Sequence, residues 1–429
     1  MCCIFFSLSS SPPYTLIIAS NRDEFLARST AKASWHSFPS PTVFRASPSS
    51  PSLAVASSAD STSKNPSVEH YALCGIDAHP SGGGTWLGVT RDGRWGALTN
   101  YTEAGPPPAP ASLQGEPYRS RGQLVKDWLR SSADVTLEEY VRGIAEVRDQ
   151  WPGFNVLLGQ VGQKPKLAYI SNRTKSGDGT TGDALHSGED GLPGGVEWII
   201  GGPSSSSSSR SNGSDVDGKE ALSTTSCGSA CSGGLSNSVL TEPWAKVTTG
   251  RQRFEECVAR AAARRDDERE GEAHLIEDLF EAMESSPGPV TTRTQMRSSV
   301  LIPPLKLPMH SPSVPAAIRS ESRMLDSPHS AHLDPAAPAA PAISRSATPL
   351  GFKKGGSASG PKTAWYATRT STVILVRQSG EVSFVERDVH VLDADGVSPT
   401  REGCGRQSER RFDFRLVEGA QREGNEVRT

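Results

Sequence analysis

The sequence contains few of the residues that build large hydrophobic cores. Only 35% of its 429 residues are hydrophobic and 6% are aromatic, whereas it has 41 glycines and 32 prolines. Part of a chain with this composition cannot bury enough apolar surface to fold. The length alone would suggest two or three domains at about 100 to 200 residues each. The composition predicts fewer domains than the length does.

The chain also lacks a strong excess of either charge and a regular cysteine pattern. Its 45 basic and 48 acidic residues leave a net charge of −3, which argues against a nucleic-acid-binding function. Seven irregularly spaced cysteines do not form a disulfide framework, so we expect a reducing compartment. Cys227 and Cys231 have no second pair of ligands nearby, and no zinc site is expected there.

No hydrophobic run is long enough to span a membrane. The longest run that might anchor the chain, Tyr14 to Ser20, is far shorter than the ~20 residues that a membrane-spanning helix needs. The first 20 residues superficially resemble a signal peptide, but they lack a basic segment and contain Pro12-Pro13. We therefore expect a cytoplasmic chain without a transmembrane helix.

Ser/Pro-rich and Gly/Ser-rich stretches interrupt the sequence, and such stretches favour solvated, extended chain over a packed core. Without them roughly 250 to 280 residues remain, which suits one large domain. We predict a single domain over residues 1–420, followed by a tail at 421–429, with insertions at about 37–69, 105–113, 203–230 and 286–362.

The remaining segments have the patterns of hairpins and helices. Paired β-prone runs with short connections predict antiparallel strands at 3–8 with 14–20, within 85–101, at 154–159 with 167–171, and at 371–377 with 381–387. Helical spacing predicts helices at 119–130, 137–151, 243–263 and 274–283. Hairpins alternating with helix pairs indicate an α+β fold with helices packed on antiparallel sheets.

The second residue, Cys2, is the first candidate for chemistry. Removal of Met1 would give Cys2 an α-amine with a pKa of about 7.7 to 8.0 beside a thiol near 8.5, so that the amine can serve as general base. Arg22 and Asp23, expected in the turn after the second strand, would reach Cys2 because the first two strands form a hairpin. The alternative is that Cys2 is only a small apolar residue in a strand.

Seven collinear blocks resemble the NRDE family, also called the Transport and Golgi organisation 2 family, over Met1 to about Leu416. They read MCCIFF, ASNRDEF, GGTWLGVTRDGRWGALTNY, SRGQLV, GFNVLLG, GLSNSVLTEPWAKV and TRTSTVILVRQSGEVSFVERDV. The family is related to N-terminal-nucleophile hydrolases. The resemblance therefore implies a four-layer α/β/β/α sandwich of antiparallel sheets.

The resemblance to the cysteine members of that superfamily also implies a set of site residues. They are Cys2 as nucleophile, Asp23 as the partner of its amine, Arg22 and Arg369 as cations that favour thiolate, and Asn100 and Asn237 as oxyanion donors. Each has a structural alternative. The asparagines also suit turns at strand ends, and Arg369 also suits a strand edge. Ser81-Gly-Gly-Gly-Thr85 lacks the phosphate-loop ending, and we interpret it as a flexible turn.

Three functions are compatible with these residues. The first is a pocket that binds a small molecule without turnover, with haem or acyl-CoA as a transient ligand and no required cofactor. The second is a cysteine amidohydrolase acting on a small amide or acyl substrate. The third is a trafficking factor that acts through unknown protein partners. Resemblance to the family implies Golgi organisation, secretion and haem or lipid handling, with peripheral association at Golgi, endoplasmic reticulum or mitochondria. The sequence offers no C-x-x-C-H haem motif.

Overall fold

The computed structural model describes residues 2–9, 13–38, 70–80, 82–102, 113, 117–162, 164–173, 196–200, 222–224, 230–264, 267–308 and 363–417. It divides into one large compact unit, residues 1–305 and 365–429, and a second unit, residues 306–364. Of the second unit, only residues 306–308 and 363–364 are described. Most of the four expected insertions, and the tail from residue 418, lie outside the described residues.

The first sheet of the large unit is antiparallel and begins with the N-terminal hairpin. Seven of its strands run in the order β10 (Leu222–Thr224), β11 (Ala230–Leu235), β1 (Cys3–Ser9), β2 (Tyr14–Phe25), β13 (Thr363–Arg377), β14 (Glu381–Asp388) and β17 (Arg410–Arg415). The N-terminal hairpin therefore lies in the middle of this sheet, between β11 and β13.

The second sheet is a seven-stranded antiparallel meander. Its strands follow the chain in the order β3 (Thr30–Phe38), β4 (His70–Asp77), β5 (Leu87–Thr90), β6 (Arg94–Asn100), β7 (Phe154–Gln160), β8 (Lys166–Ser171) and β9 (Val196–Ile200). At the β5–β6 turn Gly93 has φ +84°, a conformation that favours glycine. Shorter strands are β12 (Leu305–Pro308), β15 (Val391–Leu392) and β16 (Pro399–Thr400).

The described residues contain four α-helices, which are α1 (Gly122–Leu129), α2 (Leu137–Glu146), α3 (Ala245–Ala263) and α4 (Glu268–Met283). Short 3-10 helices are η2 (Arg148–Gln150), η3 (Gln295–Arg297) and η4 (Gly405–Ser408). Two of the α-helices have a side-chain cap at the N-terminus. Thr136 and Glu139 form a capping box on α2, and the Asp267 carboxylate accepts two backbone N–H bonds at the start of α4.

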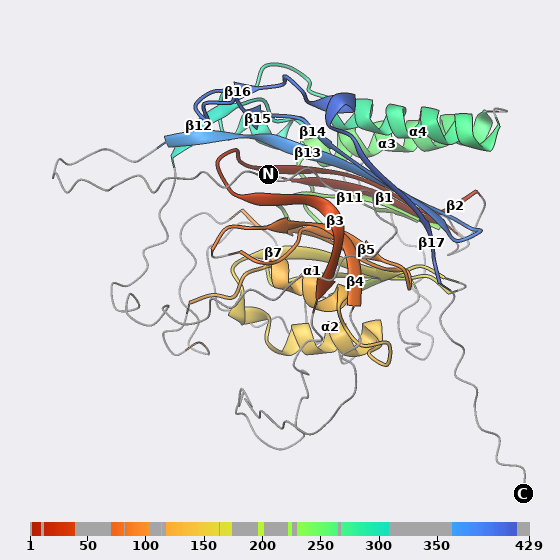
Figure 1. The fold of residues 1–429 in the computed structure, drawn as a ribbon. Coiled ribbons are helices and arrows are strands. Elements are labelled where there is room, and N and C mark those ends of the chain that lie inside the picture. Colours follow the sequence, from red (N-terminus) through yellow and green to blue (C-terminus); the bar gives the residue numbers. More distant parts are fainter. Residues whose placement is uncertain are drawn as a thin grey trace, which may run out of the picture. The chain divides into compact units, whose positions relative to one another are not determined.

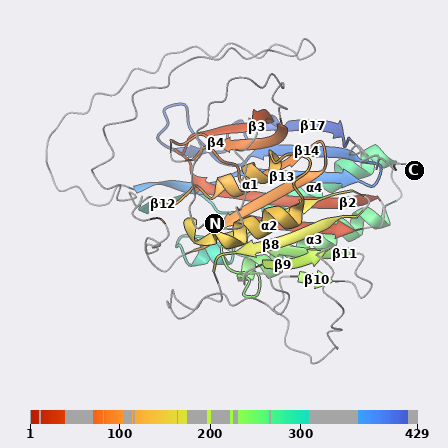
Figure 2. The ribbon, with the colours of Figure 1, turned by 90° about the horizontal axis from the view of Figure 1, so that it is seen from below.

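Three hydrophobic clusters hold the elements of the large unit together. One lies between the two sheets and includes Phe6, Ile18 and Trp95. A second joins the outer face of the meander to α1 and α2, and the third joins the outer face of the first sheet to α3 and α4. Figures 1 and 2 show the two helix pairs on the outer faces of the two sheets. The predicted α+β class, its four hairpins and its helices are confirmed.

Two details of the sequence interpretation are corrected. Residues 286–305 were expected in an insertion, but they form part of the large folded unit, where Met296, Val300 and Ile302 are buried. The glycine stretch after Ser81 is packed rather than flexible. A Cβ on Gly84 would come within 2.2 Å of the backbone of Gly122, because the stretch lies directly against the start of α1.

Candidate functional site

Alternation along β2 sends the side chains of its polar end to opposite faces of the first sheet. Ile18 belongs to the core between the sheets, whereas Ala19 belongs to the core beneath α3 and α4. By the two-residue period of a strand, Arg22 therefore faces the other sheet, and Asn21 and Asp23 face the helices. These residues were predicted in a turn after the strand. They lie within β2 itself, which continues to Phe25.

The hairpin register brings Cys2 beside Arg22. Cys3 is paired with Asn21, so the next step outward along the two strands places Cys2 opposite Arg22. On its other side Arg22 is paired directly with Thr370 of β13. Directly opposed residues in an antiparallel pair point to the same face of the sheet. Cys2, Arg22 and Thr370 therefore all face the space between the sheets.

The strand on the far side of β1 brings Asn237 into the same row. Ile4 is paired with Leu235, and continuing that register places Cys2 beside Asn237, just beyond the end of β11. A hydrogen bond fixes this approach, since the Ser236 hydroxyl donates to the Cys2 carbonyl at 2.6 Å. We call Asn237, Cys2, Arg22 and Thr370 the Cys2 row.

Arg22 is the most unusual member of the Cys2 row. It is only 6% exposed, and its guanidinium lies 4.1 Å from the ring centroid of Trp86, which immediately precedes β5 of the other sheet. Among the described residues its buried Nη1 atom has no hydrogen-bond partner. A buried guanidinium held by stacking rather than by a carboxylate leaves donors for an anionic ligand.

Asn237 and its neighbour Ser238 also carry buried polar atoms, Oδ1 and Oγ, for which the described part of the chain provides no hydrogen-bond partner. The backbone here is held firmly by the meander. The Asn155 side chain donates to the Ser238 carbonyl at 3.0 Å, and the Thr99 hydroxyl donates to the Ser236 carbonyl at 2.5 Å. The Asn237 amide is thus buried on a fixed backbone.

The structure places Asn100 less favourably than Asn237. Asn100 ends β6 and its side chain is exposed. The chain just after it does meet the Cys2 row, because the Thr102 N–H donates to the Asn237 carbonyl at 2.9 Å. The two predicted oxyanion residues therefore lie on adjacent segments, but only the Asn237 side chain is buried.

Asp23 is buried on the helix face of the sheet. The Thr368 hydroxyl donates to its Oδ1 at 2.7 Å, and the Lys246 ammonium lies 4.0 Å from its Oδ2. Its backbone carbonyl accepts a hydrogen bond from Tyr366 at 2.9 Å and a longer one from the Cys2 thiol at 3.9 Å. Burial, and then the Asp23 charge, raise the pKa of Tyr366 well above its usual value. Asp23 thus touches Cys2 through its backbone.

Two other polar residues of this region have structural partners. The Asn21 amide donates to the carbonyls of Met283 and Val300, at 2.8 and 3.2 Å, and so ties β2 to the segment after α4. Arg369 donates to the carbonyls of Phe25 and Arg28. Burial, and then the charge of Arg22, lower the pKa of Arg369 to about 10.

Sequence reasoning missed three residues of the site, namely Trp86, Lys246 and Thr370. Trp86 and Lys246 stand inside two of the quoted sequence blocks, but nothing in their spacing links them to Cys2. A residue in the position of Thr370 could have been expected from the sequence, because any strand paired with β2 must place one residue opposite Arg22. A β-bulge between Thr368 and Thr370 shifts that register, so the pairing decides which residue it is.

The family model described as Transport and Golgi organisation 2 matches residues 1–46 and 57–391. The chain belongs to this family. The family assignment predicted from the sequence blocks is thereby confirmed.

Members of the Transport and Golgi organisation 2 family from animals are similar to this chain. A mouse Transport and Golgi organization 2 homolog is 28% identical over 180 residues, which is 40% of this chain and 51% of the mouse protein. The human homolog is 26% identical over 270 residues, 61% of this chain and 66% of the human protein. The Drosophila melanogaster protein is 29% identical over 183 residues, 40% of this chain and 51% of the fly protein. The chain spans about half the length of the mouse and fly relatives.

The described residues form one further hollow outside the Cys2 row. A groove of about 740 Å³ lies between α3 and α4, where Cys257, Arg260 and Asp278 line it, on the helix side of the first sheet. In the part of the chain that the structure describes, no three His, Cys, Asp or Glu residues are grouped to bind a metal ion. None of the described helices is long and apolar enough to cross a membrane.

Proposed function

We propose that the Cys2 row binds a small acidic molecule, and that this family member supports Golgi organisation and secretion through that ligand. The supporting observation is a concentration of buried polar atoms that have no hydrogen-bond partner among the described residues. They are Arg22 Nη1, Asn237 Oδ1, Ser238 Oγ and Thr370 Oγ1. Each such atom costs about 1–3 kcal/mol when it stays unsatisfied, so a ligand that pairs with them gains affinity.

The charge of the Cys2 row selects the class of ligand. Arg22 presents a guanidinium, which pairs well with a carboxylate or a phosphate, and Trp86 beside it adds an aromatic wall. Haem carries carboxylates and an acyl-CoA carries phosphates, and both have a large apolar part. The charge of the Cys2 row therefore suits either ligand, with haem or lipid handling as the corresponding role.

Titration of hemin and of an acyl-CoA into the purified protein tests this proposal. Arg22→Ala should weaken binding at least about tenfold, because a hydrogen bond to a charged group contributes about 1.5–3 kcal/mol. Cys2→Ala should stay within a few-fold of the unchanged protein. Arg253→Ala on the exposed side of α3 is the matched control. Equal affinities of the Arg22 and Arg253 variants for both ligands would contradict the proposal.

The second candidate is a cysteine amidohydrolase, and the position of Cys2 between Arg22 and Asn237 favours it. We propose that the two face-packed antiparallel sheets with outer helix pairs are related to the sandwich of N-terminal-nucleophile hydrolases. After loss of Met1, the Cys2 thiol would attack a carbonyl, its own α-amine would take the proton, and the Asn237 amide would stabilise the oxyanion. Asn100 would be the second donor, Asp23 would hold the amine, and Arg22 and Arg369 would favour thiolate.

A hydrolysis screen with amide and thioester probes separates the two candidates. For an enzyme, Cys2→Ala should abolish turnover, and Asn237→Ala should lower the rate about 10² to 10³-fold. Intact-mass measurement must show that Met1 is absent from the active protein. If Met1 is retained, or if Cys2→Ala fully restores function in cells, the amidohydrolase reading is wrong while ligand binding stands.

We also propose that the protein is cytoplasmic and associates peripherally with the Golgi, the endoplasmic reticulum or mitochondria, which agrees with the family name. Cell fractionation tests this. A peripheral protein should leave the membrane pellet on a high-salt or carbonate wash, whereas retention in the washed pellet would contradict peripheral association.

A further inference from the structure

Lys246 is an exceptional lysine because its side chain is completely buried. The side chains of Lys246 and Asp23 are both 0% exposed, and their Nζ and Oδ2 atoms are 4.0 Å apart. A buried ion pair loses the hydration of both charges, and replacement by apolar residues is often neutral or stabilising. Stability of the core alone therefore does not explain why this site holds charged residues.

The position of Lys246 in α3 does not explain it either. It is the second residue of the helix, which begins at Ala245 without a side-chain cap. The positive end of the helix dipole lies there, so a cation in this first turn is unfavourable. Both local structure and burial oppose a lysine at this position, so its interactions must offset that cost; besides the Cys3 thiol and the Trp244 ring, they include the acidic partner Asp23.

Asp23 connects Lys246 to the Cys2 row on the other face of the sheet. Its carboxylate is held by Lys246 and by the Thr368 hydroxyl at 2.7 Å. Its backbone carbonyl accepts from the Cys2 thiol at 3.9 Å, and Arg22 precedes it in β2. Any displacement of Asp23 therefore moves both the acceptor of the Cys2 thiol and the strand that carries Arg22.

We propose that Lys246 is a positioning residue for Cys2, which acts by holding Asp23 in place from the opposite face of the sheet. This inference rests on the proposed role of the Cys2 row as the functional site. It can be tested without any ligand, because thiol alkylation reports on the surroundings of Cys2. Failure of ligand binding and failure of this inference are therefore distinguishable.

The test compares Lys246→Met, Asp23→Asn and the double variant in full-length protein. Each is treated with limiting iodoacetamide across a pH series, and peptide mass spectrometry gives the rate at Cys2 relative to Cys404 in the same sample. The other titratable groups that act on Asp23 or its neighbours, Cys3, Tyr366 and His390, stay unchanged. Arg253→Met, which removes a charge from the exposed side of α3, is the matched control.

We expect Lys246→Met to lower the ratio of Cys2 to Cys404 alkylation about fivefold and to shift its pH profile. If Lys246 acts through Asp23, the double variant should show the same profile as Asp23→Asn, since the two substitutions are then not additive. Arg253→Met should match the unchanged protein.

A purely structural Lys246 predicts something different. The variants would then melt at lower temperature, but a folded Lys246→Met protein would alkylate with the ratio and profile of the unchanged protein. That result overturns the proposal. Where Lys246→Met fails to fold, the double variant, which leaves no unpaired buried charge, decides in its place. An unchanged Cys2 profile there also overturns it.

Discussion

Arg22 and Asp23 are adjacent in the chain, yet strand geometry gives them different surroundings. Arg22 stacks on Trp86 between the sheets, and Asp23 is held by Thr368 and Lys246 on the helix face. Arg22 carries a buried donor without a partner among the described residues, whereas the Asp23 carboxylate accepts from the Thr368 hydroxyl and faces the Lys246 ammonium. We therefore assign ligand contact to Arg22 and support of Cys2 to Asp23.

The cysteines should differ strongly in reactivity. Burial raises the pKa of Cys74 to about 12 and that of Cys231 to about 11, and burial also raises the pKa of Cys3 and Cys257. A raised pKa leaves these four cysteines with little reactive thiolate near pH 7.5. Cys2 differs from them because it is only half-buried. Limiting iodoacetamide should therefore label Cys2 first. Labelling of Cys74 as fast as Cys2 would contradict the described packing.

Gly75 gives a way to disturb Trp86 without touching the Cys2 row. A Cβ at this position would lie 2.6 Å from the Trp86 ring, so Gly75→Ala should displace the ring from Arg22 and weaken ligand binding. Gly143→Ala on α2, which would meet nothing within 4 Å, is the control and should stabilise by up to about 1 kcal/mol. Titration and thermal melts on both variants check this. Normal affinity in a folded Gly75→Ala protein would show that the stack is unimportant.

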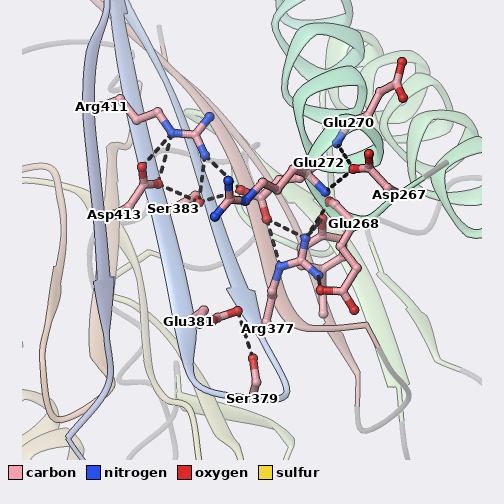
Figure 3. A network of polar contacts seen from close by, with 12 residues as sticks. Asp267, Glu268, Glu270, Glu272, Arg377, Ser379, Glu381, Ser383, Arg411 and Asp413 are labelled. Atoms are coloured by element: carbon pink, nitrogen blue, oxygen red, sulfur yellow. Dashed lines mark hydrogen bonds and ion pairs between the residues drawn. The ribbon is translucent and has the colours of Figure 1, made fainter.

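At the scale of elements, ion pairs around the buried Glu272 attach α4 to the first sheet at the end of β13. Figure 3 shows Glu272 of α4 between Arg377 and Arg411. Its carboxylate accepts from Arg377 Nε at 2.9 Å, from the Ser383 hydroxyl at 2.6 Å and from Arg411 Nη2 at 3.0 Å. Burial, and then the Glu272 charge, raise the pKa of Tyr14 to about 12. This network joins the helix to β13, β14 and β17.

Removing Glu272 should therefore loosen α4. Glu272→Ala leaves Arg377, whose side chain is 13% exposed, without its main partner, and we expect a loss of about 3 kcal/mol in the free energy of unfolding. Glu268→Ala on the same helix is the control. Its side chain is 86% exposed, so that variant should lose at most about 1 kcal/mol. Urea unfolding measures both, and equal losses would contradict the importance of burial here.

At the scale of the whole molecule, long low-complexity segments interrupt the sequence that forms the large folded unit. Loop-closure entropy rises by only about 0.6 kcal/mol per doubling of loop length. From composition we predict that residues 312–360 can be replaced by a short Gly/Ser linker with the cooperative thermal transition retained. Ile302→Ala, just before that segment, should cost about 2–5 kcal/mol because Ile302 is fully buried. Loss of the transition in the shortened chain would show that the segment is needed for folding.

Local sequence patterns determined the elements, the α+β class and the family. Alternating apolar residues with short connections predicted the four hairpins, and helical spacing predicted α1 to α4 within a few residues. Both signals are local, since strand and helix periods repeat within about ten residues. The N-terminal hairpin also sufficed to predict that Cys2 and Arg22 lie together, because hairpin register follows from adjacent strands.

Only the tertiary structure decided which distant residues complete the site. Thr370, Lys246 and Trp86 reach the strand of Cys2 and Arg22 from elements far away in the sequence, through sheet order, helix packing and the facing sheet. Residues 286–305 were likewise misjudged, because their few apolar side chains are buried by contacts with other elements and show no period of their own. Composition and periodicity describe neighbours along the chain, whereas burial and charge pairing depend on neighbours in space.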